Sequence, residues 1–108
     1  MKLLFCCAAN LNRSPTFEDY FKKNHPEYEV RSAGIYAGYP YQVNEELCEW
    51  ADIIYVMDLS QTMHFHYKYP DHFQKVRTIG ISDQYDRNDI ELIHLIEFWL
   101  KHIVDRVR

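Results

Sequence analysis

A cysteine and an arginine near the N-terminus have the types and spacing suited to phosphate chemistry. The segment from Cys7 to Pro15 reads Cys-Ala-Ala-Asn-Leu-Asn-Arg-Ser-Pro, so five residues separate Cys7 from Arg13. Five residues allow a loop to curl around a tetrahedral group and to bring a bidentate guanidinium over its oxygens. Nearby N–H donors and a cation favour the thiolate, which is the nucleophilic form of cysteine. The spacing therefore predicts a phosphate site in which Cys7 is the nucleophile.

The elements expected on either side of this segment favour the same interpretation. The apolar run from Leu3 to Cys7 predicts a strand buried on both faces. Ser14-Pro15 predicts the start of a helix with Ser14 as its cap, ending near residues 24–26. A loop that leads from a strand into a helix N-terminus presents N–H groups to an anion. The loop lacks the glycines of dinucleotide-binding loops and the Gly-Lys-Ser/Thr of nucleoside triphosphate loops. Cys7 and Arg13 would therefore have to interact with the phosphate in place of those residues.

Strand and helix patterns alternate along the rest of the chain. Further strands are predicted at 28–33, 52–58 and 75–81, and further helices at 44–50, from Ser60 to near Pro70, and after Asp89. The segments 35–41 and 82–88 read as loops. Such alternation predicts one α/β domain over residues 1–108, with a parallel sheet covered on both faces. Ligands bind beyond the carboxyl ends of such strands, so we expect a site at the loops after Cys7, Met57 and Ile81.

Composition and charge narrow the expected partners. The net charge of −4, with no run of Lys or Arg, argues against nucleic acid and acidic membranes as partners. No apolar run reaches the ~18 residues of a membrane span. Three cysteines, two of them adjacent, do not make a disulfide framework and suit a reducing compartment. We therefore expect a cytoplasmic protein that binds a small charged molecule or a peptide.

Other cysteines, aspartates and histidines are further candidates for chemistry. Cys6 should point away from the site because successive strand side chains alternate, and Cys48 should be a packed helix residue. A carboxyl group after the fourth strand would supply the proton for a leaving oxygen; Asp83 is preferred, with Asp86 and Asp89 as competitors. The spacing of three histidines does not predict a ligand set, and no metal is expected; they are His64, His66 and His72.

The segment from Cys7 to Pro15 resembles the signature loop of the low-molecular-weight protein tyrosine phosphatases, in particular a compact bacterial branch. Residues 32–34 and 52–58 are similar to further segments of that family. The resemblance implies a flavodoxin-like three-layer domain with a four-stranded parallel sheet in the order 2-1-3-4. It also implies a phosphocysteine intermediate, no cofactor, and a phosphorylated peptide, protein or small aryl phosphate as substrate.

The resemblance also implies roles for individual residues. Cys7 would be the nucleophile, Asp83 the general acid, and Tyr85 would flank the leaving group. Asn10 would shape the loop with help from Ser32. Ser14 would donate a hydrogen bond to the thiolate. The implied phosphate-binding residues are Ala8, Ala9, Asn10, Leu11, Asn12, Arg13 and Ser14.

Three positions depart from the family pattern. Ala9 replaces a glycine, Gln84 replaces the proline after the acid, and Asn12 replaces the second loop cysteine that protects the nucleophile in some members. Three alternatives to a phosphatase stay open, and the altered glycine and proline positions motivate the last of them. They are an arsenate reductase-like enzyme, for which only Cys48 remains as a downstream thiol, a phosphocarrier protein, and a non-catalytic phosphate-binding module.

Overall fold

Four parallel strands form the centre of the molecule in the computed structural model, which describes the backbone of residues 1–107 and the side chains of residues 1–99. The strands are β1 (Lys2–Cys7), β2 (Glu29–Gly34), β3 (Ile53–Val56) and β4 (Val76–Thr78). Their order across the sheet is β2-β1-β3-β4, which confirms the predicted order. The chain leaves β1 to form β2 on one side and later crosses to β3 on the other, so the switch point lies at the carboxyl end of β1.

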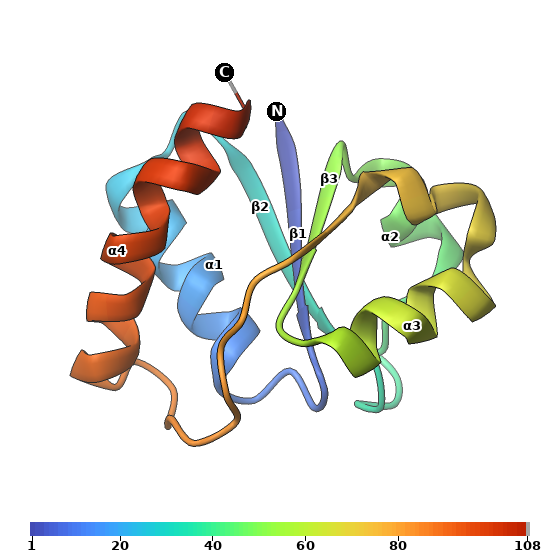
Figure 1. Cartoon of the computed structure of the whole chain (residues 1–108), viewed down its shortest axis with the longest axis horizontal. Helices are drawn as coiled ribbons and strands as arrows, with labels where there is room; N and C mark the ends of the chain where they lie inside the picture. The colour runs from blue at the N-terminus through green and yellow to red at the C-terminus, as the bar shows by residue number, and fades with distance from the viewer. Residues whose placement is uncertain (108) are drawn as a thin grey trace.

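Helices cover both faces of the sheet. The helices α1 (Arg13–Asn24) and α4 (Ile90–Val107) lie on one face, and α2 (Glu45–Trp50), α3 (Leu59–Lys68) and the 3-10 helix η1 (Pro70–Lys75) lie on the other (Figure 1). Each interface has its own apolar core. On the α1 side, Phe5 stacks between Phe17 and Tyr55, with ring centroids 4.8 and 5.3 Å apart. The predicted three-layer α/β fold is confirmed.

The alternation of side chains along β1 separates the two adjacent cysteines. Cys7 belongs to the core beneath α1, whereas Cys6 is fully buried in the core beneath α2 and α3. Cys7 is the last residue of β1 and pairs with Gly34 at the end of β2. The nucleophile candidate is therefore held at the switch point, and Cys6 faces away from it.

Two predicted helix starts are wrong. Helix α1 begins at Arg13 with Asn12 as its N-cap residue, because the Ser14 hydroxyl is turned toward Cys7 instead of capping. Helix α3 begins at Leu59, because Asp58 caps it by accepting a hydrogen bond from the Gln61 amide. The predicted cap Asn44 is confirmed, since its side chain accepts from the Leu47 amide at 2.8 Å.

The predicted strands 52–58 and 75–81 are longer than the observed ones. Strand β3 covers only residues 53–56. Strand β4 covers only residues 76–78, because η1 takes Lys75 and the regular ladder ends at Thr78. Beyond β4 the chain still follows the sheet, and the amides of Ile79 and Ile81 donate to carbonyls of Val56 and Met57. The loop after Ile81 is thus delivered to the carboxyl end of β3.

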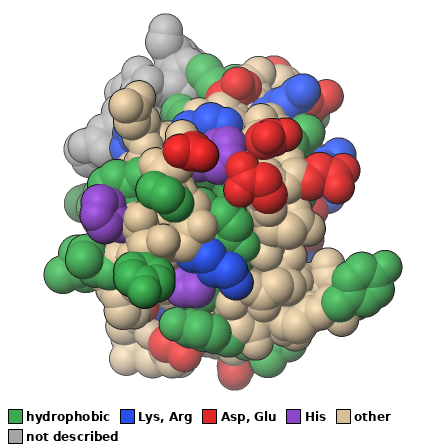
Figure 2. Space-filling model, turned by 90° about the vertical axis from the view of Figure 1, so that its right-hand side faces the viewer, with side chains coloured by type: hydrophobic (Ala, Val, Ile, Leu, Met, Phe, Trp, Pro, Cys, Tyr) green, Lys and Arg blue, Asp and Glu red, His purple; other side chains and the backbone are tan. Residues whose placement is uncertain are grey.

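The outer face of α2 and α3 carries a mixed surface. Figure 2 shows apolar, basic and acidic side chains interleaved on this face, with acidic groups gathered toward one end.

No helix in the described part of the chain is both long and apolar enough to cross a bilayer.

Candidate active site

The loop between β1 and α1 is shaped by backbone hydrogen bonds to the segment after β2. The carbonyls of Cys7 and Ala8 accept from the amides of Ile35 and Tyr36 at 2.9 and 2.8 Å. Within the described residues, the amides from Ala8 to Asn12 donate to no protein acceptor. Unpaired donors next to a helix N-terminus favour an anion. The loop therefore has the donors that a phosphoryl group needs.

Gly34 sets how closely this loop approaches β2. A Cβ atom at Gly34 would lie 2.9 Å from both the Ala9 carbonyl carbon and the Asn10 nitrogen, and 2.5 Å from the Ala37 Cβ. Side chains essentially never approach backbone so closely, so only glycine fits without moving the loop. From the sequence, Gly34 is predicted only to end a strand, and its close approach to the backbone of Ala9 and Asn10 could not be predicted.

Replacing Gly34 by alanine is expected to displace the loop. Overpacking against backbone costs about 1–3 kcal/mol, so we expect the free energy of unfolding in urea to fall by that amount. Phosphate affinity should fall as well, because the amide donors move. Gly80→Ala is the matched control, since nothing lies within 4 Å of its Cβ position. Equal destabilisation by the two substitutions would contradict this account.

Side-chain hydrogen bonds link the thiol to the loop. The Cys7 Sγ and Ser14 Oγ atoms are 3.0 Å apart, and Ser14 Oγ is also 3.0 Å from Asn10 Oδ1. Asn10 has a φ of 55°, a left-handed conformation that asparagine tolerates well. The predicted support of Asn10 by Ser32 is not seen. The Ser32 hydroxyl instead donates to Glu18, because Ser32 faces the first turns of α1.

The Arg13 guanidinium is buried and held from two sides. Its Nη1 donates to the Ile81 carbonyl at 2.8 Å and lies 3.8 Å from a carboxylate oxygen of Asp58. Its Nε lies 3.6 Å from the Asp83 carboxylate and has no hydrogen-bond partner among the described residues. A buried donor without a hydrogen-bond partner is costly, and the charge of the nearby Asp83 carboxylate offsets part of that cost.

A small cavity joins these groups. It has a volume of about 110 Å³ and is lined by Cys7, Ala8, Ala9, Leu11, Asn12, Arg13 and Asp83. That volume lies below the roughly 300–1,000 Å³ of sites for drug-sized ligands and suits a single small anion. The structure thus brings most of the predicted phosphate-binding residues together around the thiol.

The three aspartates weighed as proton donors lie in different places. Asp83 lines the cavity with its side chain 71% exposed, so it can exchange protons with water. Asp89 accepts from the Glu91 amide at 2.8 Å at the start of α4, and Asp86 does not line the cavity. Tyr85 packs partly against the α1-side core and does not line the cavity wall either.

Asp58 is a member of the site that the sequence did not single out for chemistry. Burial by itself raises the pKa of Asp58. Hydrogen bonds from Ser60 and Gln61 and the charge of Arg13 outweigh burial, and the pKa lies below its ordinary value of 3.8. The Asp58 carboxylate thus stays ionised at neutral pH beside Arg13. Its position two residues after β3 is the signal that could have identified it.

This lowered pKa predicts a loss of stability in acid. A carboxyl group with a lowered folded-state pKa stabilises the fold above its unfolded pKa, and the contribution disappears as the pH falls through the folded pKa. We expect the free energy of unfolding to fall below about pH 4, and to fall less steeply in Asp58→Asn. Urea unfolding between pH 3 and pH 6 measures this, with exposed Asp71→Asn as the control. Identical slopes for Asp58→Asn and the parent would refute it.

The two remaining cysteines are poorly suited to nucleophilic chemistry. Burial raises the pKa of Cys6 well above its ordinary value, and burial also raises the pKa of Cys48 to about 11. Both thiols are therefore protonated at neutral pH. This agrees with their predicted role as packed core residues.

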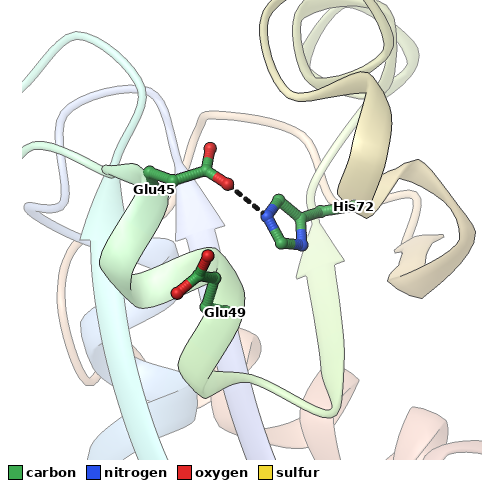
Figure 3. A group of neighbouring side chains, drawn as sticks. All are labelled: Glu45, Glu49 and His72. Carbon is green, nitrogen blue, oxygen red and sulfur yellow. Dashed lines mark hydrogen bonds and ion pairs between the residues drawn. The ribbon is translucent and has the colours of Figure 1, made fainter.

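The three histidines His64, His66 and His72 do not form one group of candidate ligands among the described residues. His64 and His66 pack against aromatic rings, whereas His72 lies in η1 and its Nε2 is 2.5 Å from Glu45. Glu49, one turn further along α2, points to the same place, and the ligand atoms of the three residues lie within 4.8 Å of one another (Figure 3). The Glu45–His72 pair links α2 to η1 on the sheet face opposite Cys7.

A wider groove adjoins the phosphate-sized cavity and shares Ala9 and Leu11 with it. Its volume is about 680 Å³. Leu11, Tyr36 and Tyr41 give it apolar walls and are 61–74% exposed. The Tyr36 ring packs edge-on against His64, with centroids 5.7 Å apart, which anchors this wall to α3.

Comparisons with known proteins point in one direction. No protein-family model matches the sequence. The curated low molecular weight protein-tyrosine-phosphatase Ptp of Acinetobacter johnsonii is 27% identical over 139 residues, which covers 94% of this chain and 96% of that protein. A crystal structure of a YwlE mutant from Bacillus subtilis matches with a TM-score of 0.84 and 21% identity, over 99% of this chain and 98% of that one.

A second solved structure shares the fold. It is a cysteine-to-serine mutant of YwlE arginine phosphatase with a phosphorylated active-site serine, and it matches with a TM-score of 0.81 and 21% identity. The match covers 99% of this chain and 95% of that one.

Proposed function

The chain is a relative of the low-molecular-weight protein-tyrosine phosphatases, and from that relationship we propose that it is a cysteine-dependent phosphomonoesterase with a phosphocysteine intermediate on Cys7. One observation carries the proposal. Cys7 and Arg13 line the same small cavity, beside amides that have no protein acceptor among the described residues. The cavity therefore brings a nucleophilic thiol next to the positive charge and the N–H donors that bind an anion.

The reaction has two steps. The Cys7 thiolate attacks phosphorus in line, the bond from phosphorus to the leaving oxygen breaks, and the Asp83 carboxyl gives that oxygen its proton. Water then attacks the phosphocysteine, with the Asp83 carboxylate taking one of its protons, and the thiolate leaves. Arg13 and the amides of residues 8–12 stabilise the charge on the phosphoryl oxygens in both steps. Ser14 stabilises the thiolate through the 3.0 Å contact with Sγ.

We favour aryl phosphates such as phosphotyrosine in a peptide as the substrate. The groove beside the cavity has apolar and aromatic walls at Leu11, Tyr36 and Tyr41, which suit an aromatic ring and a neighbouring peptide residue. A phosphoarginine side chain would instead need a free carboxylate for its guanidinium. Glu18, the acid that lines this groove, is already paired with Ser32 and Lys22.

The free thiols of the chain support a reducing environment. None of the cysteines is in a disulfide, and the proposed chemistry requires Cys7 to stay reduced. We therefore propose that the protein acts in the cytoplasm on phosphorylated peptides or proteins.

The test is hydrolysis of p-nitrophenyl phosphate and of a phosphotyrosine peptide between pH 5 and pH 8 with EDTA present. Acid quenching in the first turnover, followed by mass spectrometry, should find phosphate on the peptide that contains Cys7. A phosphoarginine peptide is tested in parallel, and faster release of phosphate from it would overturn the assignment of an aryl substrate.

The same measurements separate the alternatives. Saturable phosphate binding without turnover would identify a binding module. A phosphocysteine that forms from a donor protein and passes to an acceptor without hydrolysis would identify a phosphocarrier. Thiol-dependent reduction of arsenate that is lost in Cys48→Ala would identify the reductase.

A further inference from the structure

The loop that carries Asp83 has little internal structure of its own. Residues 82–88 form no helix or strand, and Tyr85 alone among them is not exposed. The segment contains no proline, so no pyrrolidine ring restricts its backbone. Because Asp83 is 71% exposed, packing around its side chain does not hold it in place. The Arg13 Nε, 3.6 Å away, and the partly buried Tyr85 are contacts of the first half of the loop. A contact in its second half would further restrict where the Asp83 carboxyl group lies.

Such a contact exists between the second half of the loop and α1. The Arg87 guanidinium donates to both carboxylate oxygens of Asp19 in a fork, from Nε at 3.1 Å and from Nη2 at 2.9 and 3.2 Å. The Arg87 amide also donates to Asn12 Oδ1 at 3.1 Å. The Asn88 amide donates to the hydroxyl of the buried Thr16 at 2.9 Å. We call these contacts, made by Arg87 and Asn88 on α1 and Asn12, the loop latch.

The loop latch connects the loop that carries Asp83 to the phosphate-binding loop at the start of α1. Asn12 lines the phosphate-sized cavity and immediately precedes Arg13, the first residue of α1. Arg87 is four residues from Asp83, and the loop between β4 and α4 runs past the N-terminal end of α1 (Figure 1). Docking Arg87 on α1 therefore fixes Asp83 relative to the same residues that bind phosphate.

We propose that Arg87 and Asp19 are positioning residues that hold the Asp83 loop over the phosphate cavity. The inference rests on the proposed function, because it assigns a task within that reaction. The two side chains are 53% and 40% exposed, so breaking the pair changes the population of the docked loop more than the stability of the domain.

Leaving-group dependence distinguishes this role from a general structural one. A general acid matters most when the leaving oxygen is basic, as in phenyl phosphate, and least for p-nitrophenyl phosphate. We expect Arg87→Ala, and also Asp19→Ala, which leaves the groove-lining Arg87 in place, to lower kcat/KM for phenyl phosphate about tenfold and for p-nitrophenyl phosphate by less than about twofold. Lys23→Ala, which removes an exposed cation in the last turn of the same helix, is the control and should change neither.

Two double variants complete the test. In an Asp83→Asn background, Arg87→Ala should have no further effect, because both changes remove the same proton transfer. The charge swap Asp19→Arg with Arg87→Asp should recover at least half of the activity on phenyl phosphate lost in Arg87→Ala. Equal losses on both substrates, additive effects with Asp83→Asn, or a swap without recovery would overturn the positioning role. A parent protein that does not hydrolyse p-nitrophenyl phosphate would instead overturn the proposed function itself.

Discussion

Replacing Cys7 by serine is expected to abolish multiple turnover of p-nitrophenyl phosphate, with a fall in kcat on the order of 10⁴-fold. A serine hydroxyl keeps its proton at neutral pH, and Ser14 alone among the described side chains is hydrogen-bonded to the attacking atom. No base is therefore positioned to activate the substituted hydroxyl. The thiolate needs no such base, which is why cysteine suits this loop.

Phosphate binding should survive the same substitution. The Arg13 guanidinium and the amides of residues 8–12 are unchanged, so the Kd for phosphate should stay within about threefold of the parent value. Isothermal titration and steady-state kinetics on the same preparation measure the two effects together. Cys48→Ala is the control for loss of a thiol and should retain turnover, since Cys48 lies in the opposite core. Parent-like turnover by Cys7→Ser would refute the proposed nucleophile.

The main features of the fold could be predicted because each depends on local patterns. The apolar run at Leu3–Cys7 is buried on both faces, and alternating strands and helices leave little choice of topology. The boundaries near Ser60 and after Lys75 could not be predicted as well. Asp58 competes with Ser60 as a cap, and residues 70–75 adopt a 3-10 helix whose hydrogen bonds are as local as those of a turn.

The candidate site also has features that local sequence predicts and features that it does not. Cys7, Arg13 and Ser14 could be identified because their spacing within one loop has a chemical meaning. Contacts between distant segments could not be predicted. The close approach of Gly34 to Ala9 and the pairing of Arg87 with Asp19 join residues that are 25 and 68 positions apart, and no local pattern marks them.

Asp58 and Ser32 illustrate two further kinds of error. The apolar pattern marks Asp58 only as the end of a predicted strand, although such positions collect ligand-binding groups in parallel sheets. The resemblance places Ser32 beside Asn10, whereas the Ser32 hydroxyl donates to Glu18. A shared loop sequence thus indicates shared chemistry better than it indicates each supporting hydrogen bond.

Replacing Arg13 by lysine tests whether the site needs the geometry of the guanidinium or only its charge. Lysine keeps the positive charge between Asp58 and Asp83, but it loses the planar fork that donates to the Ile81 carbonyl and places Nε beside Asp83. We expect kcat for p-nitrophenyl phosphate to fall about 10³-fold, the range found when an arginine that stabilises a phosphoryl transition state is lost.

The size of this loss at different pH values separates charge from geometry. A loss of activity that is the same at every pH between 5 and 8 reflects the lost fork, whereas a loss that grows as the pH rises reflects deprotonation of the buried lysine. Arg77→Lys is the matched control, because Arg77 also donates to backbone carbonyls but lies exposed on β4. Retention of activity within tenfold by Arg13→Lys would mean that the loop amides supply most of the stabilisation. In that case the unpartnered Nε would be a cost of the fold and not a part of the reaction.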